Sequence, residues 1–135
     1  MPHYILEKAK EKTLMEKEIH RLLAIGGISR RYCCHGYFTK CVLQALKNPL
    51  SIQNIRRDVY LPVAQELGKD IRAIEHGVRH ARDLFVNNGG TKLLAEMNGG
   101  SFWENKFPYP SDIIEIFVFY LLEREEAMNQ EKETD

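Results

Sequence analysis

The chain contains 135 residues, of which 44% are hydrophobic and 28% are charged, a composition typical of a single soluble globular domain. The formal net charge at pH 7 is zero, so the overall charge alone does not favour nucleic acid as a partner. The longest apolar stretch, residues 113–122, is far shorter than the roughly 20 residues of a membrane span, and nothing resembles a secretory signal. We therefore expect no membrane partner. The three cysteines, two of them adjacent, do not form a disulfide framework, so a reducing cytoplasm is the expected location.

The spacing of apolar residues predicts helices along the first half of the chain. The first covers residues 5–25 and ends at a glycine pair, and its charged beginning, residues 1–13, is interpreted as an N-terminal extension. A second covers about residues 36–47 and stops before Pro49. A third covers residues 51–67, where Pro62 either breaks the helix or begins a separate one at its first turn.

The second half of the chain is also predicted to be helical. A fourth helix runs from Asp70, a typical N-cap residue, to about residue 86, and a short helix covers residues 91–97. A last helix, capped by Ser111, runs to about Arg124. The highly charged residues 125–135 are expected to form a disordered acidic tail. No useful β alternation is present, so we predict an all-α fold, a compact bundle of about six helices in which residues 14–124 form one domain.

Three residues have the spacing of a helix-turn-helix, the motif that presents its second helix to a DNA groove. Ala64 is the small residue that two steeply crossed helices need at their contact. Gly68 tolerates the positive φ of a sharp turn, and Ile74 would fill the crevice between the helices. Because this spacing also arises by chance, support must come from the second helix of the motif, which is the fourth predicted helix of the chain.

The fourth predicted helix is strongly amphipathic at 100° per residue. One stripe is apolar and is expected to face the core; it contains Ile71, Ile74, Val78, Ala81 and Phe85. The opposite side carries Arg72, His76, Arg79 and Asp83, with Glu75 and His80 at its margins. A solvated surface helix is the alternative interpretation, but this face has few Glu or Lys and is rich in Arg and His. Since Arg can bind guanine bidentately and Glu can accept from cytosine, the face favours DNA reading.

Charge is unevenly distributed along the chain. Residues 1–92 contain 16 Lys/Arg and nine Asp/Glu, whereas residues 93–135 contain three and ten. The two parts therefore carry +7 and −7. This asymmetry indicates a basic working face with an acidic end turned away from it, although acidic tails are also common aids to solubility.

Several segments resemble a known family of DNA-binding domains. They are residues 55–67 (IRRDVYLPVAQEL), residues 74–81 (IEHGVRHA), Ile19-His20, Gly36-Tyr37 and residues 110–114 (PSDII). Together they resemble the effector domain of the stage-zero sporulation response regulator, the master transcription factor of endospore-forming Gram-positive bacteria. The resemblance covers about residues 14–124. It implies a six-helix, helix-turn-helix domain that binds short promoter boxes in double-stranded DNA, often as tandem copies, with contacts or a homodimer formed through the C-terminal helix, residues 111–124.

The resemblance carries over to individual positions of the fourth helix. Glu75, Arg79 and His80 match family positions on the DNA-facing helix. Ala73 and His76 stand where the family has arginines. Each lost bidentate guanine contact should cost about 1–3 kcal/mol of discrimination, so the target box is expected to differ. The family also has an N-terminal receiver domain, for which this chain has no room, so the control of its activity is left open.

The leading hypothesis is a sequence-specific transcription regulator. The residues expected near base edges are Arg72, Glu75, His76 and Arg79, and those expected near phosphates are Lys69, His80, Arg82, Arg56, Arg57 and Lys92. The alternative is a protein-interaction module that keeps the fold and modulates a related regulator without reading DNA. No paired carboxylates, nucleophile motif or Gly-rich phosphate loop indicates an enzyme, and no cofactor is expected.

Two groups of residues contain side chains that can bind metal ions. His76 and His80 have a spacing that can bind a metal on one helix face, but no third ligand is evident nearby. Cys33, Cys34 and Cys41 match no standard zinc pattern and do not form a disulfide framework. We interpret the cysteines as core residues and predict no metal, although a redox or metal role of these thiols is left open.

Overall fold

The computed structural model describes residues 3–100 and 108–133, with side chains described for residues 14–100 and 108–131. Within these ranges the chain forms helices and no strand, which confirms the all-α prediction. The α-helices are α1 (His3–Ile25), α2 (Cys33–Lys47), α3 (Leu61–Leu67), α4 (Ile71–Asn87), α5 (Thr91–Met97) and α6 (Pro110–Glu133). Between α2 and α3 lie a 3-10 segment, η1 (Pro49–Asn54), and a π-helical turn, η2 (Arg56–Tyr60).

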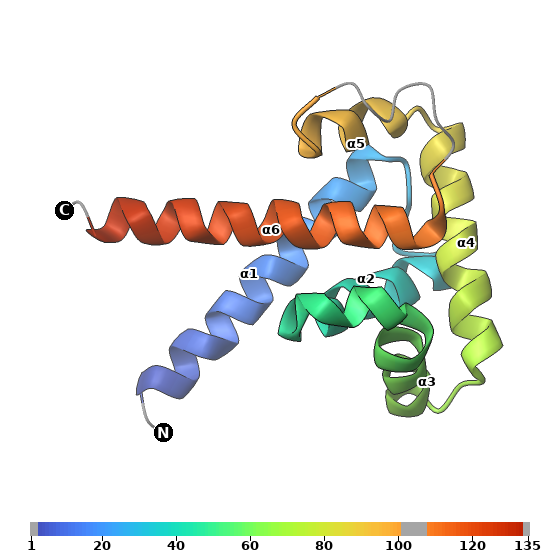
Figure 1. The fold of residues 1–135 in the computed structure, drawn as a ribbon, viewed down its shortest axis with the longest axis horizontal. Helices are drawn as coiled ribbons and strands as arrows, with labels where there is room; N and C mark the ends of the chain where they lie inside the picture. Colours follow the sequence, from blue (N-terminus) through green and yellow to red (C-terminus); the bar gives the residue numbers. More distant parts are fainter. Residues whose placement is uncertain (1–2, 101–107, 134–135) are drawn as a thin grey trace.

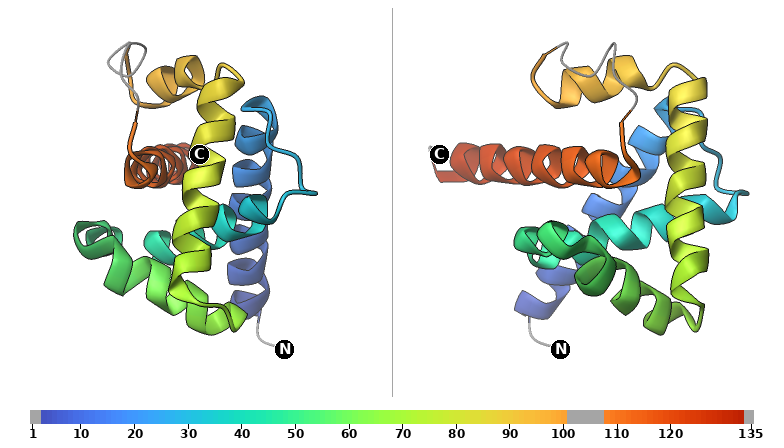
Figure 2. Two further views of the ribbon diagram at one scale, coloured as in Figure 1. Left: turned by 90° about the vertical axis from the view of Figure 1, so that its right-hand side faces the viewer. Right: turned by 45° about the vertical axis from the view of Figure 1, so that its right-hand side comes forward.

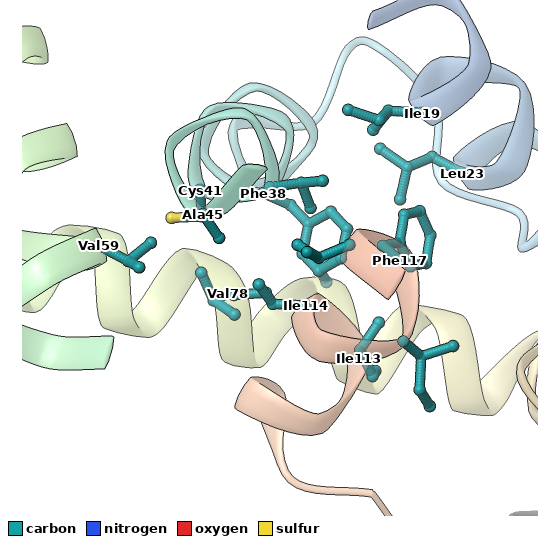
Figure 3. Packing of buried hydrophobic residues seen from close by; sticks show 14 of the residues in the cluster. Ile19, Leu23, Phe38, Cys41, Ala45, Val59, Val78, Ile113, Ile114 and Phe117 are labelled. Carbon is teal, nitrogen blue, oxygen red and sulfur yellow. The ribbon is translucent and has the colours of Figure 1, made fainter. Parts of the chain in front are cut away.

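The hydrophobic core surrounds α2, which contacts α1, α3, α4 and α6 (Figure 3). Three buried aromatic rings meet in this core. The ring centroid of Phe38 on α2 lies 5.0 Å from that of Phe117 on α6, and the Phe117 centroid lies 6.0 Å from that of Phe85 on α4. Both pairs meet edge to face, an arrangement that aromatic quadrupoles favour. The position of α4 therefore depends on residues from both ends of the chain.

The segment between α2 and α4 differs from the single predicted helix. It is divided into η1, η2 and α3, and in η2 the backbone N–H of Leu61 bonds to the carbonyl of Arg56. Pro62 lies in the first turn of α3, where its missing N–H leaves no hydrogen bond unmade, so the prediction that Pro62 begins a separate helix is confirmed. In addition, α2 starts at Cys33 rather than near Gly36.

The last helix departs most from the sequence prediction. The backbone N–H of Tyr109 donates to the Asp112 carboxylate at 2.8 Å, so Asp112, and not Ser111, caps the start of α6. The helix continues to Glu133, so residues 125–133 are helical where a disordered tail was predicted. These residues are mainly Glu, Ala, Met, Gln and Lys, which have high helix propensity, and no glycine or proline interrupts them.

The two chain ends project on the side of the bundle opposite α4 (Figure 1). The acidic half of α6 therefore extends away from α4, and in the left view of Figure 2 α4 runs across the front of the molecule. No helix in the described part of the chain is both long and apolar enough to cross a membrane.

Candidate nucleic-acid interface

The connection between α3 and α4 is a short turn built around Gly68. This residue has φ +64° and ψ +37°, a left-handed conformation that glycine adopts without steric cost. The N–H groups of Lys69 and Gly68 donate to the carbonyls of Ala64 and Gln65 at 2.9 and 3.3 Å, the Schellman pattern that closes a helix. Ala64 and Ile74 are both buried on the two sides of this turn. The turn thus has the geometry of a helix-turn-helix.

The start of α4 is fixed by Asp70. Its carboxylate accepts from the backbone N–H of Arg72 at 2.8 Å, as an N-cap residue does, and also from the Arg72 Nε at 3.2 Å. The side-chain hydrogen bond to Arg72 is the main cause that lowers the pKa of Asp70 below its usual value. Since 84% of the Arg72 side chain is exposed, its guanidinium can exchange this carboxylate for another partner without disturbing the core.

The inner face of α4 packs closely on α2. Gly77 lies against Tyr37, and a Cβ atom added to Gly77 would come within 2.5 Å of the Tyr37 ring. Val78, Ala81 and Phe85 are buried beside it. This close approach fixes the rotation of α4 about its axis, so the polar residues are directed away from the core.

The outer face of α4 presents basic side chains in successive turns. Arg72, His76, Arg79 and His80 are exposed. Both acidic residues of α4, Glu75 and Asp83, are paired with arginines. Glu75 accepts from Arg56 Nε at 2.6 Å, and the Asp83 carboxylate lies 3.0 Å from the Arg82 guanidinium. The acidic charges on this helix are therefore offset, and the exposed face is basic.

Basic residues from η2 and the turn flank the beginning of α4. Arg56 reaches α4 through its contact with Glu75, of which 29% of the side chain is exposed. Arg57 bonds to Asp58 at 2.9 Å, and Lys69 is exposed in the turn. The structure thus brings eight of the ten predicted contact residues to one region: Arg72, Glu75, His76, Arg79, His80, Lys69, Arg56 and Arg57.

Two predicted phosphate contacts differ from these eight residues, because Arg82 is largely covered and Lys92 lies on another helix. The Arg82 side chain is only 15% exposed and donates to Asp83. Lys92 is on α5, beyond the C-terminal end of α4, and α4 with its 17 residues is about 25 Å long. Neither residue lies near the first turns of α4, where this motif reaches base edges.

The loop between α1 and α2 contributes residues that sequence reasoning missed. It projects from the bundle beside α4 (Figure 2), and Arg30, Arg31 and Tyr32 are exposed on it. The Tyr32 ring lies 6.1 Å from the His80 ring, and the Asn88 amide donates to the carbonyl of Gly27 at 3.3 Å. The Arg-Arg-Tyr run was a visible signal, but its proximity to α4 depends on tertiary structure.

The groups considered as metal sites hold no cluster of ligands. Among the side chains described, residues 14–100 and 108–131, no group of three or more His, Cys, Asp or Glu is arranged to hold a metal ion. Cys34 and Cys41 are buried, Cys33 is exposed, and all three are free thiols. Burial raises the pKa of Cys41 to about 12, so this thiol stays protonated at neutral pH.

Comparison with known protein families shows which family the chain resembles. A family model described as "Sporulation initiation factor Spo0A C terminal" matches residues 19–121. The match includes the last third of α1, the complete helix-turn-helix and the first half of α6. No curated protein and no solved structure matched the chain.

Proposed function

Because the chain belongs to the family of the sporulation initiation factor Spo0A C-terminal domain, a DNA-binding domain, we propose that it is a sequence-specific transcription regulator that reads promoter boxes with α4. The family consists of transcription-factor domains and not of enzymes. The observation that carries the proposal is the basic outer face of α4, whose inner face is fixed against α2 while its arginines and histidines remain exposed.

Base recognition would begin with the first turns of α4. Arg72 and Arg79 are exposed and can each donate two hydrogen bonds to a guanine edge. Glu75 can accept from the amino group of cytosine once Arg56 leaves it, and Arg56 is then available for a phosphate. His76 lies on the same face and would complete the set of base contacts.

Phosphate contacts would surround this helix. Lys69, Arg56 and Arg57 flank its beginning, and His80 lies farther along it beside Tyr32. Arg82 and Lys92 would meet phosphates only where the duplex continues toward α5. We also propose that copies of the domain contact one another through residues 111–124 when they bind in tandem, and that the protein acts in the cytoplasm.

A second candidate function is a protein-interaction module that modulates a related regulator. Two observations favour it. Ala73 and His76 replace arginines of the family pattern, and the two arginines nearest the start of α4, Arg56 and Arg72, are paired with carboxylates in the protein itself. Such a module would keep its partner when Arg79 is removed, whereas a DNA reader would not keep its duplex.

Fluorescence anisotropy with duplexes selected from a random pool tests the proposal. We expect a recovered motif, and an affinity that falls with salt at a slope of about −0.9 per neutralised phosphate. Arg79→Ala should weaken binding to the recovered motif by about 1–3 kcal/mol. Lys47→Ala, which removes an exposed lysine from the last turn of α2 outside the predicted contact residues, is the control and should leave binding unchanged. An empty selection with a flat salt response would contradict DNA reading and favour the interaction module.

A further inference from the structure

A pocket of about 350 Å³ lies at the end of α1, separate from the outer face of α4. Its wall includes five basic or titratable side chains: Lys17, His20 and Arg21 from α1, Arg30 from the loop and His35 from α2. No Asp or Glu belongs to this wall among the described residues. The pocket is therefore cationic, and its size is within the range of small-ligand sites.

Arg30 and His20 form the first part of the arrangement. The Arg30 guanidinium donates to His20 Nδ1 at 2.9 Å. Because arginine is only a donor, this nitrogen carries no proton and the His20 ring is neutral. Burial and the nearby Arg30 both lower the pKa of His20, while Glu16, whose carboxylate lies 4.0 Å from His20 Nε2, opposes this effect.

His35 forms the second part. Its side chain is buried, with 5% of the residue exposed, and its ring lies 4.7 Å from the His20 ring between centroids. Among the residues that the structure describes, neither ring nitrogen of His35 has a hydrogen-bond partner. Burial, followed by the neighbouring His20 and Arg30, lowers the pKa of His35. Because His35 lines the pocket, a bound anion can reach its ring and serve as a hydrogen-bond acceptor.

The charges around these histidines do not cancel. Glu18 accepts from Arg21 at 2.6 Å and from Arg124 of α6 at 3.0 Å, so the charge of Arg21 is offset. Lys17 and Arg30 have no such carboxylate within the pocket wall. The charged and titratable groups around the two rings are Glu16, Lys17, Glu18 and Arg21 on α1, Arg30 on the loop and Arg124 on α6.

We propose that this pocket binds a phosphate-type oxyanion, which Lys17 and Arg30 attract and to which His35 donates a hydrogen bond. Arg30 would turn from His20 Nδ1 to the anion, and this nitrogen would then be free to take up a proton. Arginine and histidinium bind such oxygens through short, charge-assisted hydrogen bonds. The anion can be a free phosphorylated compound or a phosphate of a DNA backbone, since the loop that carries Arg30 also contacts α4 through Tyr32.

Titration of the free protein with inorganic sulfate tests this proposal without DNA. Sulfate keeps its charge across neutral pH, so any change of affinity with pH reports the protein. We expect saturable NMR shifts of the His20 and His35 ring protons, and tighter binding as the pH falls and the histidines become protonated. Sodium chloride at equal ionic strength should not reproduce these shifts. A linear response without saturation, or an equal response to chloride, would overturn the proposal.

Substitutions in the pocket wall test where the sulfate binds. Lys17→Ala and Arg30→Ala should each weaken sulfate binding about tenfold, the cost of one charge-assisted interaction. Arg31→Ala is the control, because it is exposed on the same loop outside the pocket wall. An equal loss in Arg31→Ala would contradict the site. Because replacement of the buried His35 can impair folding, the second test is His20→Gln, with its fold checked by circular dichroism. This variant should reduce the pH dependence of sulfate binding to the part that His35 contributes.

DNA binding by the same variants identifies the source of the anion. If a backbone phosphate occupies the pocket, Arg30→Ala weakens binding to the duplex as well, and sulfate competes with DNA more strongly than chloride does. If the anion is a free compound, duplex affinity stays unchanged while sulfate binding is lost. Arg79→Ala should leave sulfate binding intact in both cases, so a failure of DNA reading and a failure of this site are distinguishable.

Discussion

The α4 side of the molecule and the side of the chain ends are built in opposite ways. On the α4 side a tight turn, a close α2–α4 contact and a shared aromatic core fix a basic helix. On the other side α1 and α6 extend from the bundle, and the second half of α6 is acidic. The two helices enclose an apolar groove of about 270 Å³ lined in part by Leu14, Met15 and Met128. A net charge of zero therefore conceals two regions with different charges and different packing.

Loss of the shared core should affect both regions at once. Phe117→Ala removes the ring between Phe38 and Phe85 and should lower the free energy of unfolding by about 3–5 kcal/mol. Urea denaturation followed by circular dichroism measures this loss. Phe119→Ala, on the same helix but 46% exposed, should cost about 0.5 kcal/mol or less. Equal losses in the two variants would mean that Phe117 does not join the two regions.

A change at the turn should affect the α4 side selectively. Gly68→Ala places a Cβ atom on a residue with φ +64° and should lower the free energy of unfolding by about 1–2 kcal/mol. Gly36→Ala is the matched control, since Gly36 lies inside α2 with open space around it. That control should stabilise the protein by about 0.5–1 kcal/mol, because alanine is the better helix former. A gain in stability from Gly68→Ala would contradict the left-handed turn.

The Asp70 cap should give the start of α4 a dependence on acid. The folded-state pKa of Asp70 is lowered, chiefly by its hydrogen bond to Arg72, so its contribution to stability is present above the unfolded-state pKa of about 3.9. This contribution should be lost as the pH falls below that value and through the folded-state pKa. Asp70→Asn keeps a capping oxygen and should reduce the acid dependence, whereas Asp70→Ala should also fray α4, which amide hydrogen exchange measures. An unchanged exchange rate in Asp70→Ala would contradict the cap.

Neutralising the acidic end of α6 should have the smallest effect. Replacing Glu123, Glu125 and Glu126 together with Gln should change duplex affinity less than about twofold at physiological salt. The second half of α6 extends away from α4 (Figure 1), and salt screens exposed charges over a length of about 8 Å. Fluorescence anisotropy on the same duplex measures this change. A rise in affinity of tenfold or more would show that the acidic end approaches the DNA, and that the two regions are not separate.

The sequence predicted those parts of the fold that depend on local chemistry. Amphipathic spacing identified α4, and the Asp70 cap and the Gly68 turn set its beginning. It did not predict the π-helical turn of η2, because the extra residue is accommodated by packing between α2, α3 and α4. The predicted length of α6 was too short, because the high charge of residues 125–133 is typical of disorder although these residues also have high helix propensity.

The candidate interface was predictable where it follows from one helix face, as for Arg72, His76 and Arg79. Which predicted residues are covered, and so cannot contact DNA freely, depends on tertiary structure. Arg82 follows Ala81 on α4, and its low exposure reflects neighbours that a helical projection cannot include. For the same reason the approach of Tyr32 to His80, and the meeting of His20, Arg30 and His35, were not visible in the spacing of residues.

The loop between α1 and α2 is attached to α4 at two points, through Asn88 and Gly27 and through His80 and Tyr32. The same loop carries Arg30 into the anion pocket. An anion that alters this loop and a duplex that holds α4 would then be linked ligands in the thermodynamic sense. If the bound anion changes the affinity for the duplex by some factor, the bound duplex must change the affinity for the anion by the same factor. A single coupling free energy, measured from either ligand, therefore describes both effects.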